Sequence, residues 1–303
     1  MNQFKGDLLL LITAIIWGTS FVSQKLGMNY VEPFTFGASR FLLGALVLIP
    51  VIYIFEKLDA KKDQKKQKTK QKTKPLIIGG ILCGSALFMG ASFQQWGILF
   101  TTAGKSGFIT ALYIVLVPIF GLFMRKKVNW LTWSGVALAI FGLYLLTIQE
   151  DLSLQKGDAL VLVGTVFWAL QIIFVDLFVD KVEGLKLSFM QFVTAGLLSL
   201  VAALIFESPN IEEIIAGGKV ILYTAVMVVG VAYTLQIIGQ KYTSPTAAAI
   251  IMSLESVFAV ISGAIFLGES MNLKETMGCL VMFAAVVLTQ LKPEDITKLF
   301  KKA

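Results

Sequence analysis

Long uninterrupted apolar segments dominate this sequence of 303 residues. A bilayer core about 30 Å thick requires about 20 apolar residues per helix, and the chain holds ten windows of that kind, bounded by charged residues, Pro or Gly. They cover residues 7–27, 33–55, 76–99, 105–124, 130–149, 157–179, 187–206, 219–240, 246–267 and 273–291. With 56% hydrophobic and 15% charged residues, the composition is also far from that of a soluble domain. The sequence therefore predicts an all-α integral membrane protein with ten transmembrane helices.

The composition excludes several classes of function. The chain contains no His, which excludes His-based catalysis and His-ligated zinc. Its two cysteines, Cys83 and Cys279, lie in separate apolar runs, so neither a Cys-rich metal site nor a disulfide framework is expected. The net charge of +7 comes from Lys and Arg clustered in short loops, a pattern that membrane topology explains better than nucleic-acid binding. We expect no metal, no cofactor and no nucleic-acid partner.

Lys and Arg are divided unevenly between the two sets of loops. With the N-terminus in the cytoplasm, twenty of the 26 basic residues fall on the cytoplasmic side and five on the outer side, and Arg40 remains inside a span. Because cytoplasmic loops carry the excess of Lys and Arg, both termini are predicted to be cytoplasmic in a multi-pass protein of the cell membrane. The Lys-rich segment 57–74 is too polar to pack, so we expect a disordered, topology-setting cytoplasmic loop, with binding of anionic lipid as the less favoured alternative.

The two halves of the chain are similar to each other. Residues 5–25 align without gaps on residues 156–176, so that Lys-Gly-Asp coincides and Trp17 matches Trp168. Because each half contains five predicted helices, an odd number, the second half enters the membrane inverted relative to the first.

This repeat defines the predicted domain organisation. We predict a first five-helix repeat at residues 1–150, a second, inverted repeat at 151–292, and a cytoplasmic tail at 293–303. Inverted repeats are the construction that lets a transporter exchange inward-open and outward-open states. Asp7 and Asp158, which begin their predicted helices at matching positions, are expected to act as helix caps.

Four segments carry a resemblance to a known family. They are IIWGTSF at 15–21, VFWALQ at 166–171, LESVFAVISGAIFLGESMN at 254–272 and MGCLVMFAAVVL at 277–288. Together with the two five-helix halves, they resemble EamA-type transporters of the drug/metabolite transporter superfamily. Ser256 takes the place of the proline in that family's Glu-Pro…Gly-Glu segment, which removes a proline kink. The resemblance implies a cavity surrounded by predicted helices 1, 3, 4, 6, 8 and 9.

Two charged residues within the spans are candidate functional groups, because a charge at membrane depth is costly and usually faces a cavity or a partner. Glu255 lies ten residues past the proline that begins its segment, about 15 Å along the helix and near the midplane. It is a candidate proton carrier or contact for a cationic substrate, with a structural carboxylate as the alternative. Arg40, about 10 Å deep, is a candidate partner for a substrate carboxylate or for an acidic side chain.

Polar and aromatic side chains form stripes on several predicted helices. Trp17, Ser20 and Gln24 share one face of the first helix at a spacing of three to four residues. Lipid offers no hydrogen-bond partner, so such stripes should face protein or water, and we expect them to line one central pathway. Hydrogen bonding between helices is the alternative, and Trp96 fits either the cavity wall or the interfacial aromatic belt. The predicted substrate pathway comprises Trp17, Ser20, Gln24, Arg40, Gln95, Trp96, Tyr113, Trp168, Gln171, Tyr233, Gln236 and Glu255.

These patterns favour a secondary-active transporter that exports amino acids or related small metabolites by alternating access, with proton coupling through Glu255. A multidrug or organic-cation exporter with an anionic, aromatic cavity and a passive uniporter are the alternatives. An enzyme is not expected, because the few charged residues within the spans are too widely spaced to form a catalytic cluster. The expected partners are a small-molecule substrate and the lipid bilayer, and the sequence carries no signal for the oligomeric state.

Overall fold

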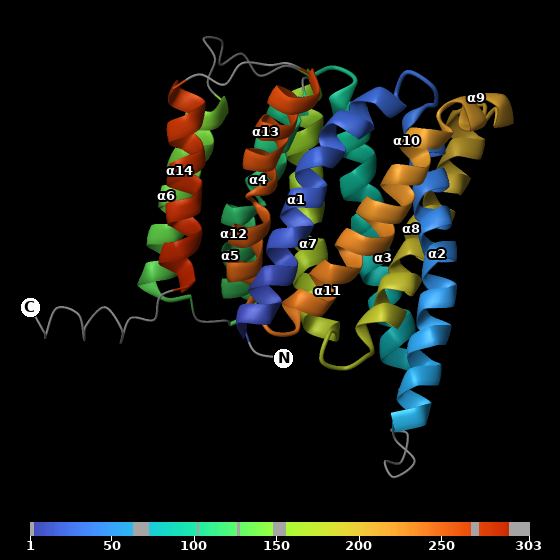
Figure 1. Ribbon diagram of the computed structural model, residues 1–303, viewed down its shortest axis with the longest axis horizontal. Coiled ribbons are helices and arrows are strands. Elements are labelled where there is room, and N and C mark those ends of the chain that lie inside the picture. Colours follow the sequence, from blue (N-terminus) through green and yellow to red (C-terminus); the bar gives the residue numbers. More distant parts are fainter. Residues whose placement is uncertain are drawn as a thin grey trace, which may run out of the picture.

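The computed structural model describes residues 3–62, 73–101, 103–125, 128–147, 156–267 and 273–290, in which all regular structure is helical. The helices form one bundle (Figure 1). In chain order they are α1 (Gln3–Gly27), α2 (Pro33–Lys62), α3 (Thr73–Ile98), α4 (Ala103–Ala111), α5 (Tyr113–Phe123), α6 (Trp130–Thr147), α7 (Lys156–Phe178), α8 (Gly184–Phe206), α9 (Ile211–Ala216), α10 (Gly218–Tyr223), the π-helix η1 (Thr224–Tyr233), α11 (Thr234–Gln240), α12 (Pro245–Met252), α13 (Glu255–Leu267) and α14 (Leu273–Gln290).

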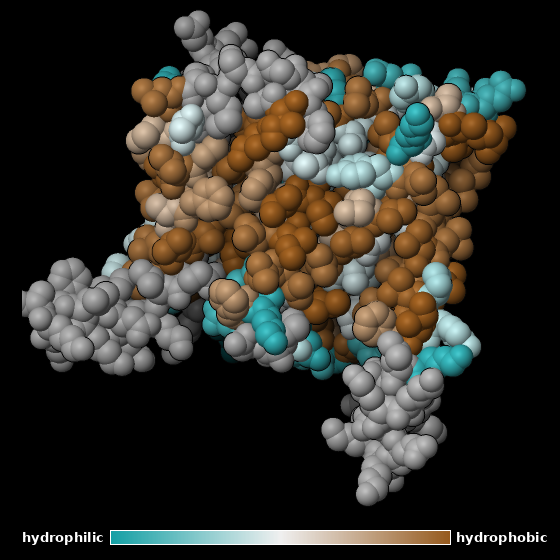
Figure 2. Space-filling model, viewed as in Figure 1, coloured by the Kyte–Doolittle hydropathy of each residue, from teal (hydrophilic) through white to brown (hydrophobic). Residues whose placement is uncertain are grey.

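The surface of this bundle is suited to lipid. Within the described ranges, eight helical stretches are long and apolar enough to cross a bilayer, and two apolar stretches, Trp130–Gly142 and Thr276–Leu288, are shorter. Phe4, Tyr53 and Phe206 are each more than half exposed. Figure 2 shows apolar residues across the middle of one face, with polar residues towards its upper and lower edges. The prediction of an all-α integral membrane protein is confirmed.

The helices extend further than predicted at the Lys-rich segment. Helix α2 continues to Lys62 and α3 begins at Thr73, so the prediction of a loop over 57–74 is wrong for residues 57–62 and 73–74. Glu, Lys, Leu and Ala dominate residues 56–62, and these residues have high helix propensity, which explains the longer helix. Residues 63–72 and the predicted tail 293–303 lie outside the described residues.

Helices α1 and α7 lie at the centre of the packing. Helix α1 contacts η1, α11, α12 and α13, while α7 contacts α3, α4 and α5. Helix α2 packs along α8 and η1, and α3 packs along α8 as well as α7. Helices α6 and α14 pack mainly on each other, at one edge of the bundle in Figure 1. Helices α1 and α7 and the helices that contact them are therefore positioned to line a site inside the bundle.

Two of the predicted spans are divided into shorter helices. Leu112 separates α4 from α5, and a turn at Ser253–Leu254 separates α12 from α13. At the second break, Ser253 Oγ donates to Ile250 O at 2.7 Å and Ser256 Oγ donates to Ser253 O at 2.8 Å. Serine hydroxyls thus satisfy carbonyl groups at the break. The helix is interrupted here although Ser256 stands where the related family has proline.

The predicted span 219–240 is continuous but contains a π-helical segment. Between α10 and α11 the backbone is π-helical over Thr224–Tyr233, a form that is rare and is often found at functional sites. The Thr13 hydroxyl of α1 lies 3.1 Å from Ala232 O in this segment and 3.0 Å from Leu9 O in its own helix. A side chain from a neighbouring helix therefore supports the irregular backbone.

Glu207, at the end of α8, caps the beginning of α2. Its carboxylate accepts hydrogen bonds from Phe34 N, Thr35 N and Thr35 Oγ1, each at 2.7 Å. The first N–H groups of a helix have no partner within the helix, and a carboxylate also interacts favourably with the positive end of the helix dipole. This contact fixes the end of α8 to the start of α2.

Replacing Glu207 with Ala should lower the free energy of unfolding by about 1–2 kcal/mol, because the cap and its charge are lost. Glu207→Gln should cost less, since an amide oxygen still accepts a hydrogen bond. Chemical unfolding in detergent micelles measures both. Glu212→Ala, which removes an exposed carboxylate, is the control, and equal stability of Glu207→Ala and this control would contradict the assignment of the cap.

Candidate substrate cavity

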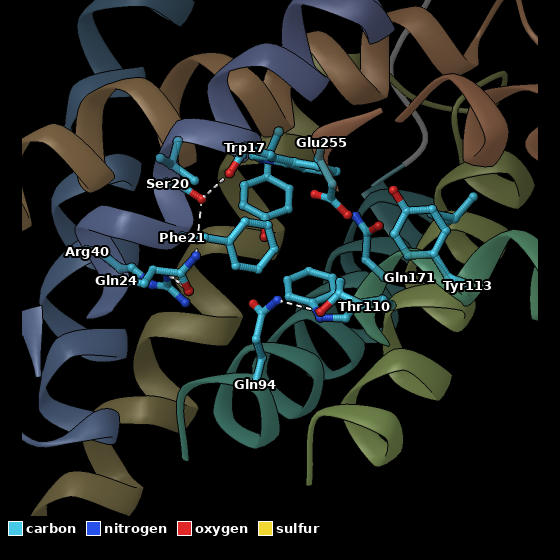
Figure 3. A pocket seen from close by; sticks show the side chains of 14 residues that line it. Trp17, Ser20, Phe21, Gln24, Arg40, Gln94, Thr110, Tyr113, Gln171 and Glu255 are labelled. Carbon is cyan, nitrogen blue, oxygen red and sulfur yellow. Dashed lines mark hydrogen bonds between the residues drawn. The ribbon is translucent and has the colours of Figure 1, made fainter. Parts of the chain in front are cut away.

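A cavity lies among α1, α2, α3, α4, α5, α7, η1 and α13 (Figure 3). The centre of a water molecule has about 30 Å³ of space within it, which is enough for about two waters. The cavity as observed is therefore too small for a metabolite. Its lining residues are Trp17, Ser20, Phe21, Gln24, Arg40, Gln94, Thr110, Tyr113, Trp168, Gln171, Ile172, Val228, Tyr233 and Glu255.

Nine of the twelve predicted pathway residues line this cavity, and Gln95, Gln236 and Trp96 do not. Gln95 Nε2 donates to Gln24 O at 3.1 Å. Gln236 Nε2 donates to Gln171 Oε1 and Gln240 Oε1, both at 2.9 Å. These two amides connect helices beside the cavity, as the alternative of helix–helix hydrogen bonding predicts.

Trp96 lines a second pocket away from the first. This pocket has about 410 Å³ of space and is lined mainly by apolar and aromatic side chains, among them Phe34, Phe88 and Phe100. The Trp96 ring lies 6.0 Å from that of Phe34. The structure therefore does not bring Trp96 to the central cavity.

Five lining residues were not among the predicted ones: Phe21, Gln94, Thr110, Ile172 and Val228. Phe21 follows Trp17 by four residues, and Thr110 precedes Tyr113 by three, so helical spacing carried a signal for both. Gln94 Nε2 donates to Thr110 Oγ1 at 2.8 Å. Ile172 and Val228 are apolar residues in apolar helices, where the sequence offers no signal.

Three aromatic rings form one wall of the cavity. Tyr233, the last residue of η1, has its ring 4.8 Å from that of Trp17 and 6.1 Å from that of Trp168. Both indole Nε1 groups are buried, and within the described residues neither has a hydrogen-bond partner. Buried indole N–H groups normally find an acceptor, so both are available to a molecule in the cavity.

Arg40 reaches the cavity from α2. Its Nη1 donates to Gln24 Oε1 at 3.2 Å, and the guanidinium lies 5.1 Å from the Phe36 ring and 4.9 Å from the Phe41 ring. The side chain is 3% exposed, and no described residue accepts a hydrogen bond from its Nε or forms a salt bridge with it. A buried guanidinium held in this way suits an anionic ligand group.

Glu255 is the first residue of α13, directly after the break at Ser253–Leu254. The beginning of a helix favours a negative charge, which fits the structural interpretation of this carboxylate. The residue is 3% exposed, and neither its Oε1 nor the Tyr113 hydroxyl, which lines the same cavity, has a hydrogen-bond partner among the described residues. The geometry therefore also leaves a carboxylate oxygen available to a ligand.

Comparisons with known proteins cover nearly the whole chain. The model of the EamA-like transporter family matches twice, over residues 4–148 and 155–291. An "Uncharacterized transporter" of Archaeoglobus fulgidus is 30% identical over 96% of this chain and 88% of its own length. The "Uncharacterized inner membrane transporter YedA" of Escherichia coli K12 is 24% identical over 91% of this chain and 88% of its own. A solved crystal structure at 16% identity, with a TM-score of 0.71, covers 93% of this chain and 95% of that chain, which shows a shared fold.

Gly18 allows α1 to approach the first turn of α13. A Cβ at this position would lie 2.8 Å from Glu255 O and would also collide with the Phe258 side chain. At Gly107, in α4, the nearest atom to an added Cβ would be 3.5 Å away, in the Phe21 ring. The two glycines therefore offer a matched pair of positions beside the cavity.

The variant Gly18→Ala should lose about 1–3 kcal/mol of stability, because the added methyl group meets backbone that cannot move without displacing α13. Gly107→Ala should be neutral or slightly stabilising, since alanine is the better helix former. Thermal unfolding in detergent measures both. Equal stability of the two variants would show that α13 does not depend on the close approach at Gly18.

Proposed function

Because the chain belongs to the EamA-like transporter family, we propose that it is a secondary-active transporter that exports amino acids or related small metabolites by alternating access. Transport as such follows from the family and from the names of the relatives. The substrate class rests on one observation: Arg40 and Glu255 line the same buried cavity, and neither forms a salt bridge with any described residue.

A buried acidic group and a buried basic group in one cavity favour a zwitterionic ligand. A buried charge without a partner is costly, and a molecule that carries both a carboxylate and an ammonium group would neutralise both residues at once. The carboxylate would accept hydrogen bonds from the Arg40 guanidinium, and the ammonium would donate to Glu255. An amino acid carries these two groups on one carbon atom.

The aromatic wall suits the remainder of such a molecule. Trp17, Trp168 and Tyr233 line the cavity, and the two indole N–H groups have no hydrogen-bond partner among the described residues. Rings of this kind bind apolar side chains by burial and offset stacking. A metabolite needs more than the 30 Å³ of space in this closed form, so binding requires the surrounding helices to separate. That requirement supports alternating access.

An organic-cation exporter is the second candidate. Glu255 with Trp17 and Trp168 would offer a cation both a counter-charge and ring faces, but Arg40 in the same cavity repels a ligand that carries only a positive charge. A passive uniporter is the third candidate, and it would have no need of a titratable Glu255. The two buried charges together favour the zwitterion.

The inverted-repeat architecture is part of the same proposal. The two family matches, at 4–148 and 155–291, support two related halves. Contacts between the halves also correspond: α3 packs on α7 as η1 and α11 pack on α1, and α3 packs on α8 as η1 packs on α2. With α6 and α14 as the fifth helix of each half, the chain would cross the membrane ten times, with both termini cytoplasmic.

Phenylalanine, phenethylamine and hydrocinnamate test the substrate class, because they share a ring and differ only in charge. In proteoliposomes we expect phenylalanine, the zwitterion, to be transported at least about thirtyfold more efficiently than the lone cation or anion, since truncating one partner of a buried charge pair costs about 2–5 kcal/mol. Arg40→Gln should remove the preference over phenethylamine, and Glu255→Gln the preference over hydrocinnamate.

Lys219→Gln and Glu212→Gln, which change exposed charges of α10 and α9, are the matched controls and should retain both preferences. A wild-type protein that transports phenethylamine in preference to phenylalanine would establish the organic-cation exporter instead. Metabolite profiling of cells that overproduce the protein extends the test to amino acids without a ring.

Proton coupling through Glu255 has a separate test. Gln has nearly the same size and hydrogen-bonding capacity but does not titrate. In proteoliposomes with an imposed proton gradient, Glu255→Gln should abolish accumulation of substrate against its gradient while exchange of internal for external substrate continues. Accumulation at the wild-type rate would show that Glu255 is structural and would favour the uniporter.

A further inference from the structure

Asp7 takes part in a contact between the two family-matched segments at one end of the bundle. Its Oδ1 accepts a hydrogen bond from Thr243 Oγ1 at 2.7 Å. One residue earlier, a Cβ at Gly6 would lie 2.9 Å from Tyr242 Cβ and 3.0 Å from Gly239 O. The start of α1 therefore lies directly against the turn between α11 and α12. We call Gly6, Asp7, Gly239, Tyr242 and Thr243 the Asp7 cluster.

Asp158 makes the same contact with another turn. Its Oδ1 accepts a hydrogen bond from Thr101 Oγ1 at 2.6 Å. A Cβ at Gly157 would lie 2.6 Å from Gly97 O and 3.0 Å from Phe100 Cβ. The start of α7 therefore lies directly against the turn between α3 and α4. We call Gly97, Phe100, Thr101, Gly157 and Asp158 the Asp158 cluster.

The two clusters correspond residue by residue. Gly6 and Asp7 match Gly157 and Asp158 at an offset of 151, and the sequence Gly-Ile-Leu-Phe-Thr at 97–101 matches Gly-Gln-Lys-Tyr-Thr at 239–243 at an offset of 142. Each cluster joins the segment matched at 4–148 to the segment matched at 155–291. The start of α1 and the start of α7 lie at opposite ends of the bundle in Figure 1. The expectation that Asp7 caps its helix is wrong, because α1 begins at Gln3 and Asp7 lies beyond its first turn. Asp158 lies in the first turn of α7 as expected, and each aspartate also accepts a hydrogen bond from a connection between two other helices.

We propose that the two clusters are the closed contacts of two gates, one at each end of the central pathway. Both contacts are formed in this structure, and the central cavity has only about 30 Å³ of space. Opening towards one side then requires the Asp–Thr hydrogen bond and the close glycine contact at that end to separate while the other cluster stays formed. This inference rests on the proposed alternating access and names the residues that alternate.

Removal of one threonine hydroxyl should bias the protein towards opening at that end. Thr243→Val and Thr101→Val keep the shape of the side chain and delete the donor. Each removes one hydrogen bond to a carboxylate, which corresponds to about a tenfold shift in the ratio of open to closed gate. The readout is the labelling of Ser20→Cys, inside the cavity, by a membrane-impermeant thiol reagent, with Cys83 and Cys279 replaced by Ala.

The reagent is added separately to each side of oriented vesicles. Thr243→Val should raise the rate of labelling from one side by about tenfold, and Thr101→Val should raise it from the opposite side by a similar factor. The opposite direction of the two effects is the essential result, and it does not depend on the orientation of the protein. Thr224→Val is the matched control, because among the described residues the Thr224 hydroxyl bonds to Val220 O and Ile221 O, close to its own position in the chain.

Gly6→Ala and Gly157→Ala provide an independent disruption of the same contacts. Each added methyl group meets backbone oxygen across the contact, so Gly6→Ala should act in the direction of Thr243→Val, and Gly157→Ala in the direction of Thr101→Val. If the paired variants increase labelling from the same side, or change it no more than Thr224→Val does, the proposal is overturned.

The labelling needs no substrate, so it separates this proposal from the one on substrate class. Opposite effects in a protein that does not transport phenylalanine would support the gates and reject the amino-acid substrate. Unchanged labelling in variants that still transport phenylalanine would reject the gates and leave the transport proposal standing.

Discussion

Every backbone N–H and C=O inside a bilayer must find its partner within the protein. The candidate site lies where the helices are interrupted or irregular, so that the regular backbone hydrogen bonds are disturbed. Tyr113 begins α5, Tyr233 ends the π-helical segment, and Glu255 begins α13. Hydroxyl groups support two of these irregular places: Thr13 beside η1, and Ser253 with Ser256 at the α12–α13 turn. Irregular backbone at this depth is tolerated where it is buried in protein or lines a cavity, so the cavity and the interruptions depend on each other.

The electrostatics of the site follow from the same burial. Arg40 is anchored by Gln24 and by two aromatic rings, and Glu255 lies at the favourable end of a helix. These contacts stabilise the charged forms of two side chains that form no ion pair with any described residue. The cap that Glu207 provides also contributes to the position of Arg40. Helix α2 carries Arg40, and the cap fixes the start of this helix to the end of α8. The helix that positions the guanidinium is therefore held at its start by the end of α8.

The sequence predicts the helices well, because a span of apolar residues about as long as the bilayer is thick has few alternatives to a helix. It also predicts most of the cavity, since polar residues such as Ser20 and Gln171 at helical spacing must face the interior. It fails where contacts join residues distant in the chain. Trp96 shares its helix with cavity residues but faces another pocket, and the Asp7–Thr243 bond spans 236 residues. The break before Glu255 depends on local serine bonds, which apolar periodicity does not reveal.

The small volume of the closed cavity has a consequence for the energy balance of the cell. A bacterial or archaeal membrane stores energy as a difference in proton and ion concentration, and any continuous column of water through a protein would dissipate it. About 30 Å³ of space in the central cavity holds about two water molecules, too few for such a column. Close packing around Trp17, Tyr233 and Trp168 is thus compatible with a membrane that stays electrically insulated, and a transporter packed in this way need not lower the membrane potential on which other machinery depends.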